Sequence, residues 1–267
     1  MKRVWIAIVI VFAALAGVIV WQVAQPHETE PVYKGKRLSE WLKACAVNPY
    51  ISQGERQKHW QEARAALGQA GTKAIPTLLR MLRAKDSSLK LKLLALAKRQ
   101  HIINISFTPD DTWHRSAVVG FEILVQLVGA KQVQSAVPAV IDIAERNTNG
   151  YAIGVLIAIG PSAKEAVPML LGWATNGVMR RTSVLALGYI HAEPDQVVPV
   201  LIESLHDPDL SVQLSALASL GDFGPEAKLA VPVLVELLNA TDEYVRGDVT
   251  NALKAIDPEA AAKAGIK

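Results

Sequence analysis

A β-branched residue followed by proline recurs along this 267-residue chain at nearly even steps. The steps between the five prolines are 62, 30, 31 and 33 residues, and 62 is twice 31. A period close to thirty residues is typical of arrays in which one helix pair stacks on the next. The period therefore predicts an α-solenoid, whose hydrophobic core is a continuous strip. The prolines are Pro76, Pro138, Pro168, Pro199 and Pro232.

Apolar residues occupy the positions two, three and six residues after each proline in all five copies. In the first copy these are Leu78, Leu79 and Leu82. The offsets fall on one side of an α-helix and on no single face of a strand. Because proline disfavours the α region for the residue before it, each proline should either begin this first helix or kink it.

A second helix is expected in each unit, because a residue suited to a helix N-cap recurs before another apolar run. Gly160-Pro161 and Gly224-Pro225 then supply a glycine past the end of one helix and a proline to begin the next. Each unit is thus predicted to be helix, turn, helix, turn. The predicted N-cap column comprises Asp86, Thr148, Asn176, Asp209 and Asp242.

The segment from Gly224 to Arg246, with its Val-Pro-Val-Leu and Asp-Glu-Tyr-Val-Arg elements, resembles HEAT-type repeats. The resemblance is closest to the short form named after phycobilisome lyases, and it covers residues 67–257. It implies an all-α, right-handed solenoid of HEAT-like helical hairpins, which we assign to residues 33–267. Residues 33–42 are also similar to the lead-in of membrane-tethered bacterial HEAT-like proteins.

The doubled step between Pro76 and Pro138 interrupts the repeat, and Asn104–Phe107 reads as a short non-helical stretch. The following Thr-Pro-Asp-Asp, residues 108–111, predicts a cap, a proline at the first helical position and two acids in the first turn. We interpret the interval as a degenerate second unit with a loop in place of its first helix. Irregular segments on regular scaffolds often carry function, which makes Asn104 and Phe107 candidate site residues. A decayed repeat would look the same.

The N-terminus holds an uncharged apolar run at residues 4–21, which as a helix would span about 27 Å, close to a bilayer's hydrocarbon core. Lys2 and Arg3 precede it, so residues 1–21 are predicted to be a signal anchor that leaves the rest of the chain outside the cytoplasm. Residues 22–32 read as a linker. We therefore expect a single-pass protein of the cell membrane, with the solenoid on the extracytoplasmic side. The alternative is a cleaved signal peptide and a periplasmic or secreted protein.

Charge is divided unevenly along the predicted solenoid. Residues 33–100 carry 15 Lys/Arg and 4 Asp/Glu, a net of 15 − 4 = +11, whereas residues 101–267 carry 11 and 19, a net of 11 − 19 = −8. The basic half could attract anionic lipid headgroups. Alternatively, the two halves are solvated helix faces that differ only in composition.

Motifs for catalysis, metal binding or cofactor binding are missing from the sequence. Cys45 is the single cysteine, and the six histidines show no His-x-x-x-His spacing, so no metal is predicted. The glycine-rich and Gly-x-Ser-x-Gly motifs are also missing, so neither a cofactor nor catalytic residues are predicted. The resemblance to bilin lyases leaves open a lyase-like accessory role, but what is shared is the repeat and not a catalytic group. Export argues against a nucleic-acid partner.

The position after the predicted first turn of the second helix is basic or polar in most units. In HEAT-like arrays the second helices tend to line the concave face, so this column could grip an acidic protein. It could instead be a structural ladder of acid–base pairs four residues apart, such as Asp242 with Arg246. The sequence thus predicts a non-catalytic scaffold for another protein, of unknown identity. The candidate partner-binding residues of the column are Lys90, Arg180, Gln213 and Arg246, with Arg181 beside them.

The signal-anchor prediction can be tested by carbonate extraction of membranes that contain the full chain. We expect the chain to stay in the pellet, because the insertion of a transmembrane helix into a bilayer is effectively irreversible. A variant with Ala14→Asp and Leu15→Asp should be released, since each mid-span acid costs about 2.5–3.5 kcal/mol of insertion. Release of the unaltered chain would overturn the anchor.

Overall fold

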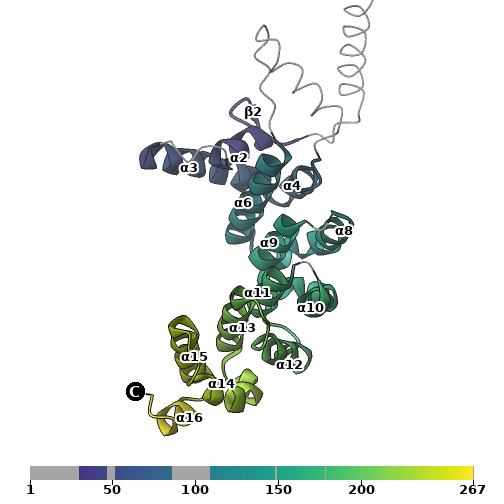
Figure 1. Cartoon of the computed structure of the whole chain (residues 1–267). Helices are drawn as coiled ribbons and strands as arrows, with labels where there is room; N and C mark the ends of the chain where they lie inside the picture. The colour runs from purple at the N-terminus through teal and green to yellow at the C-terminus, as the bar shows by residue number, and fades with distance from the viewer. Residues whose placement is uncertain (1–29, 47–51, 86–108, 148, 178, 267) are drawn as a thin grey trace, which may run out of the picture.

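The computed structural model describes residues 30–46, 52–85, 109–147, 149–177 and 179–266. Within these residues, two short antiparallel strands, β1 (Val32–Tyr33) and β2 (Lys36–Arg37), precede a chain of helices. The helices form two rows, which Figure 1 shows as a curved stack with the second row on the inner side of the bend. Consecutive second-row helices pack on one another. The described residues thus form an α-solenoid.

The first row comprises α2 (Leu38–Ala46), α4 (Ile75–Leu82), α8 (Val137–Asn147), α10 (Val167–Asn176), α12 (Pro194–Ser204) and α14 (Val231–Leu237). The second row comprises α3 (Gln53–Ala70), α6 (Asp110–Val128), α9 (Gly150–Ile159), α11 (Arg180–Ile190), α13 (Leu210–Phe223) and α15 (Glu243–Ile256). Between units lie η1 (Gly71–Ala74), α7 (Ala130–Val133), η2 (Gln134–Ala136), η3 (Gly160–Ala166) and η4 (Gly224–Ala230), and α16 (Pro258–Lys263) follows the last unit.

Four of the five repeat prolines begin a helix, because each is the second residue of α4, α8, α10 or α14. The first N–H groups of a helix have no intrahelical acceptor. A proline at the start of a helix therefore costs no backbone hydrogen bond, although it has no N–H. The residue before each is nonetheless α-helical; Val167, for example, has φ −54° and ψ −47° where it ends η3. Pro199 differs, because it lies inside α12, which starts at Pro194.

Of the three predicted apolar positions, those two and six residues after each proline face the core. The position three residues after it is partly buried in four units and is exposed at Val235 in the fifth. The residue two positions after each proline is fully buried, and the residue six positions after it is buried in four units and partly buried in the fifth. These positions belong to one cluster of buried apolar side chains that runs from Leu38 to Ala261. The expectation of a continuous strip of core is therefore confirmed. The fully buried positions are Leu78, Val140, Leu170, Leu201 and Leu234.

The predicted N-caps are correct in the two distal units. Asp209 accepts a hydrogen bond from the Ser211 N–H at 2.9 Å, and Asp242 accepts from the Tyr244 N–H at 2.8 Å. The glycine–proline pairs also act as predicted, because Gly160 and Gly224 end α9 and α13 with φ of 63° and 53°.

Two other predicted caps were wrong. The cap of α9 is Asn149 rather than Thr148: its side-chain oxygen accepts from the Tyr151 N–H at 3.0 Å, and its amide donates to the Leu82 carbonyl at 3.2 Å. Asn176 is the last residue of α10, and the N-cap position of α11 is Met179, which makes no side-chain cap. The fifth predicted cap, Asp86, lies outside the described residues.

Within the described residues, the doubled proline step holds α4 and α6, whereas residues 86–108 lie outside them. The interpretation of this interval as two units, the second of them degenerate, therefore stays a prediction. α4 packs directly on α6, which occupies the second row beside α9. Gly120 of α6 allows this approach, because a Cβ there would lie 2.4 Å from Leu78 Cδ2 of α4. α4 and α6 thus pack together although residues 83–109 separate them in the sequence. Pro109 is the N-cap residue of α6, so the helix begins at Asp110, one residue later than predicted.

Glu30, the first described residue, makes contacts with both α2 and α4. One carboxylate oxygen accepts from the Ser39 N–H at 2.6 Å, and the other pairs with Arg80 at 2.7 Å. The predicted span 4–21 lies outside the described residues. Among those described, one helical stretch, Gly150–Thr175, is long and apolar enough to cross a membrane, with half of its apolar window buried inside the array. A core helix meets the same length and composition criterion.

The close packing of α11 on α13 yields a stability prediction. A Cβ on Gly188 would lie 2.5 to 2.9 Å from the side chain and Cα of Ser219, so Gly188→Ala should destabilise the fold by about 1–3 kcal/mol. Gly247 of α15 is the matched control, because a Cβ there meets nothing within 4 Å. Gly247→Ala should instead stabilise by about 0.5–1 kcal/mol. Urea unfolding measures both, and equal effects of the two substitutions would contradict the packing.

Candidate partner-binding face

The accessible positions of three consecutive second-row helices carry no charge along most of their length. α9 contains no charged residue, α11 has charge only at Arg180 and Arg181 in its first turn, and α13 has charge only at Asp222 near its end. Between these ends the accessible residues are uncharged, and we call the small or apolar ones at the centres of the three helices the neutral strip. The neutral strip comprises Gly154, Ala158, Leu185, Tyr189, Leu214 and Ala218.

The neutral strip is bordered by charged helices on both sides. α6 exposes Arg115 and Glu122, whereas α15 exposes Lys254 and partly exposes Asp248. Within the strip, the side chain of Tyr189 is 53% exposed. A charge-depleted centre with an aromatic residue and a polar rim is the usual anatomy of a protein–protein interface.

The predicted basic column borders the strip where the first-row helices turn into the second row. Arg180 pairs with Asp207 at 3.1 Å, and because Asp207 precedes α13, this ion pair joins adjacent units. Gln213 donates to the backbone carbonyl of the same Asp207 at 2.7 Å. Arg181 is exposed and, among the described residues, makes no hydrogen bond or ion pair.

Arg246 also interacts within the chain. Its guanidinium donates to the carbonyls of Ala240 and Thr241 at 2.7 and 2.8 Å, so it holds the turn before α15. The expected pair with Asp242 does not form, because that carboxylate accepts from backbone N–H groups as the N-cap. Lys90, Asn104 and Phe107 lie outside the described residues. Partner binding by any of the column residues stays a prediction.

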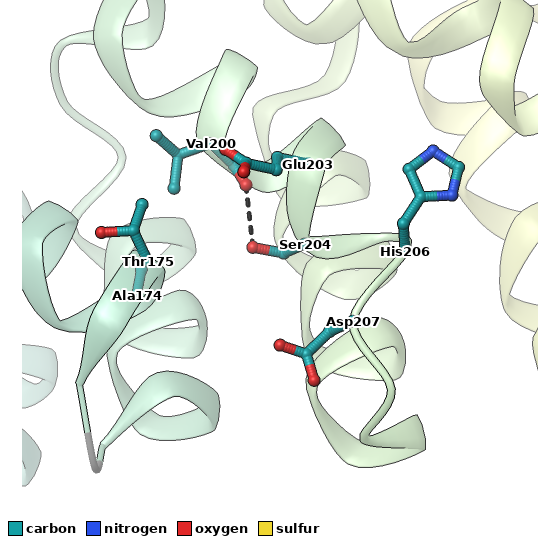
Figure 2. Close-up of a pocket in the computed structure, with 7 residues that line it drawn as sticks. All are labelled: Ala174, Thr175, Val200, Glu203, Ser204, His206 and Asp207. Atoms are coloured by element: carbon teal, nitrogen blue, oxygen red, sulfur yellow. Dashed lines mark hydrogen bonds between the residues drawn. The ribbon is translucent and has the colours of Figure 1, made fainter.

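A cavity of about 250 Å³ opens between the C-terminal ends of α10 and α12 (Figure 2). Its Ser204 hydroxyl donates to the Val200 carbonyl of its own helix at 2.8 Å, so it is not aligned with an acid or base. In Figure 2, His206 points away from Ala174 and Thr175. This geometry supports no nucleophilic chemistry at the cavity. The lining residues are Ala174, Thr175, Val200, Glu203, Ser204, His206 and Asp207.

A second cavity, of about 310 Å³, lies where α6 and α9 begin. At this junction the Tyr151 hydroxyl donates to the Asp111 carboxylate, which also pairs with Arg115. The hydrogen bond from Tyr151 and, to a smaller extent, the contact with Arg115 lower the pKa of Asp111. The hydrogen bond to Asp111 also raises the pKa of Tyr151. His114 lies 2.8 Å from the Ala84 carbonyl. The group therefore links α6 to α9 and provides no activated base.

The single thiol is shielded as well. Cys45 is partly buried at the end of α2, and burial raises the pKa of its thiol to about 11. A thiol with so high a pKa is protonated at neutral pH and is a weak nucleophile. Among the described residues, no group of three or more His, Cys, Asp or Glu side chains could hold a metal ion.

The sequence reasoning missed the neutral strip, although a signal for it was present. The run from Tyr151 to Ile159 is apolar on every side of the helix, whereas a helix with one buried face would alternate with polar residues. Such a run contains no member of a charged column. In the structure, part of this apolar helix remains accessible: Gly154, Ile157 and Ala158 of α9 are only partly buried.

Comparison with known protein families gives a match in the distal part of the chain. The family described as HEAT repeats matches residues 165–254, which span α10 to α15. No curated protein matches the chain.

Solved structures of repeat proteins are similar at low identity. An engineered protein from the Northeast Structural Genomics Consortium is 16% identical, with a TM-score of 0.44 over 86% of this chain and 98% of its own. A designed armadillo repeat protein in complex with the peptide (KR)4 is 14% identical, with a TM-score of 0.46 over 83% of this chain and 100% of its own. A second designed armadillo repeat protein is 16% identical, with a TM-score of 0.38 over the same shares.

The two arginines at the start of α11 give a matched test of the structural ladder. Arg180→Gln should lower the free energy of unfolding by about 0.5–1 kcal/mol, because it removes a partly exposed ion pair with Asp207. Arg181→Gln removes an exposed arginine without such a pair and should change stability by less than about 0.5 kcal/mol. Urea denaturation followed by circular dichroism measures both. Equal losses would show that the ion pair contributes nothing.

Proposed function

We propose that this protein is a non-catalytic scaffold that binds another protein through the neutral strip on α9, α11 and α13. The observation that carries the proposal is the lack of charge at the accessible positions of these helices, between charged neighbours on α6 and α15. Contiguous exposed apolar surface rimmed by polar residues marks interaction sites on soluble folds. The function is thus recognition of a largely apolar partner surface.

The residues of the strip and its rim suggest how the partner is held. Tyr189 and Leu185 lie four apart on α11 and would act as anchors, since aromatic side chains dominate the binding energy of interfaces. Arg181 at one edge and Asp222 at the other carry opposite charges, which would fix the orientation of the partner more than its affinity. The binding energy therefore comes from the centre and the selectivity from the rim.

The architecture suits this role because the core strip makes neighbouring units stiff. A surface held rigid by packed helices loses little conformational entropy on binding. In this proposal the array is a right-handed solenoid of the short HEAT-like type. It is held outside the cytoplasm by residues 4–21, or is released there if the N-terminal segment is cleaved. A lyase-like accessory role would also use such a surface, but no group described at the strip favours it.

Site-specific photocrosslinking in cells tests the proposal. A benzophenone amino acid at Ala218, which is exposed within the strip, should crosslink to one discrete protein. The control position is Val235 on the first-row helix α14, which is 38% exposed and should give no such product. Both substitutions replace a small or branched apolar residue, so general surface hydrophobicity is matched.

A charge introduced into the strip should abolish the product. Leu185→Glu places a carboxylate at the centre of the interface, and we expect at least about tenfold weaker crosslinking, since an unpaired buried charge is strongly unfavourable. Val235→Glu should leave the yield unchanged. The helical circular dichroism of both variants serves as the folding control. Equal yields from positions 218 and 235, or full yield with Leu185→Glu, would rule out the strip as the binding face.

A further inference from the structure

The N-terminal end of the array is basic. Residues 32–64, which form the strand pair, α2 and most of α3, contain seven Lys/Arg and three Asp/Glu, an excess of 7 − 3 = +4. Five of the seven basic side chains are exposed and the other two are partly exposed. Figure 1 shows these elements together at one end of the stack. The basic residues are Lys34, Lys36, Arg37, Lys43, Arg56, Lys58 and Arg64.

Aromatic side chains are interleaved with these cations. Within the described residues, every cation–π contact lies at this end: Lys34 over Tyr33 at 5.2 Å, Lys36 over Trp41 at 4.7 Å, Lys43 over Trp113 at 5.7 Å and Arg64 over Trp60 at 5.2 Å. Tryptophan and tyrosine favour the membrane–water interface, where lysine and arginine extend toward headgroups. The combination is characteristic of a surface that meets lipid.

The first half of α3 projects beyond the packed units. From Ser52 to Gln61 nearly every residue is exposed, and the buried residues of the helix come only later, from Ala63 to Leu67. Arg56, Trp60 and Arg64 are spaced four apart and share one helix face, and the Trp60 ring is 38% exposed. The exposed Trp60 ring therefore adds an apolar group to the basic surface of this helix face.

We propose that this basic, aromatic end docks on the headgroups of an anionic bilayer. Charge complementarity supports lipid, because four uncompensated positive charges lie at this end while residues 101–267 carry a net −8 and would be repelled. Chain length supports it as well. Only residues 22–29 separate the predicted span 4–21 from Glu30, and eight residues reach at most about 28 Å. With the predicted anchor in place, this end would stay close to the membrane.

Docking can be measured on the full chain in lipid nanodiscs. A fluorophore is attached to Gln57→Cys in a Cys45→Ala background, and the lipids carry a nitroxide quencher on their headgroups. We expect strong quenching with about 30% phosphatidylglycerol at about 0.05 M salt. The quenching should be lost at about 0.5 M salt, where the Debye length is roughly threefold shorter, and in pure phosphatidylcholine.

Matched charge variants separate docking from general electrostatics. Removing Lys36, Arg37 and Lys58 by substitution with Gln should weaken the docking equilibrium about a hundredfold, roughly fivefold per basic residue near the surface. Substituting Lys164, Lys254 and Lys263 by Gln changes the net charge equally at distant exposed positions and should have no effect. Helical circular dichroism confirms that both variants fold.

Three results would overturn the proposal. The first is equal quenching in neutral and anionic nanodiscs, and the second is no quenching in either. The third is tight binding of polyglutamate at this end with no lipid contact, which would assign the surface to an acidic protein. Should the chain not remain in the nanodiscs, vesicles of the same two compositions mixed with the labelled chain give the same readout. The measurement therefore does not depend on the anchor, and the charge argument is tested by itself.

Discussion

The close approach of consecutive second-row helices is the contact on which the rest of the array depends. A glycine lies at several of these contacts: Gly154 against Val118, Gly188 against Ser219 and Gly221 against Ala252. At the tightest of them, the Ser219 hydroxyl donates to the Val184 carbonyl at 3.0 Å, so the two helices are joined by a hydrogen bond as well as by packing. Such contacts need small residues, and they explain part of the neutral character of the inner face. They do not explain Tyr189 or Ala218, which are accessible.

The sequence predicted the elements whose signals are local. Proline with its apolar offsets located the first-row helices, since both the start of the helix and its buried face depend on residues within one turn or two. Asp209 and Asp242 capped their helices for the same reason. Prediction failed where a tertiary contact decided the outcome. Asn149 replaces Thr148 as a cap because its amide also bonds the Leu82 carbonyl, 67 residues earlier in the chain.

The candidate site shows the same division between local and distant contacts. The sequence placed Arg180 and Gln213 in one column, and the structure brings both to Asp207, a residue that the column did not contain. The pairing of Arg180 with Asp207 spans 27 residues and crosses from one unit to the next, so no helical spacing could predict it. By contrast, the missing charge of α9 was visible in the sequence. An uncharged helix does not by itself predict a binding surface, because a helix that is buried on all sides has the same composition.

The two proposed surfaces are compatible because they lie on different parts of the array. The neutral strip begins at α9, whereas the basic end consists of the strand pair, α2 and α3, with α4 and α6 between them. In the proposed arrangement, headgroup contacts at the basic end and repulsion of the acidic half would hold the strip away from the bilayer. An apolar surface that must bind protein gains from this separation, because lipid would otherwise compete for it. In this arrangement the two features have complementary roles. The basic end would fix the orientation of the array on the bilayer, and the neutral strip in the middle would bind the partner protein.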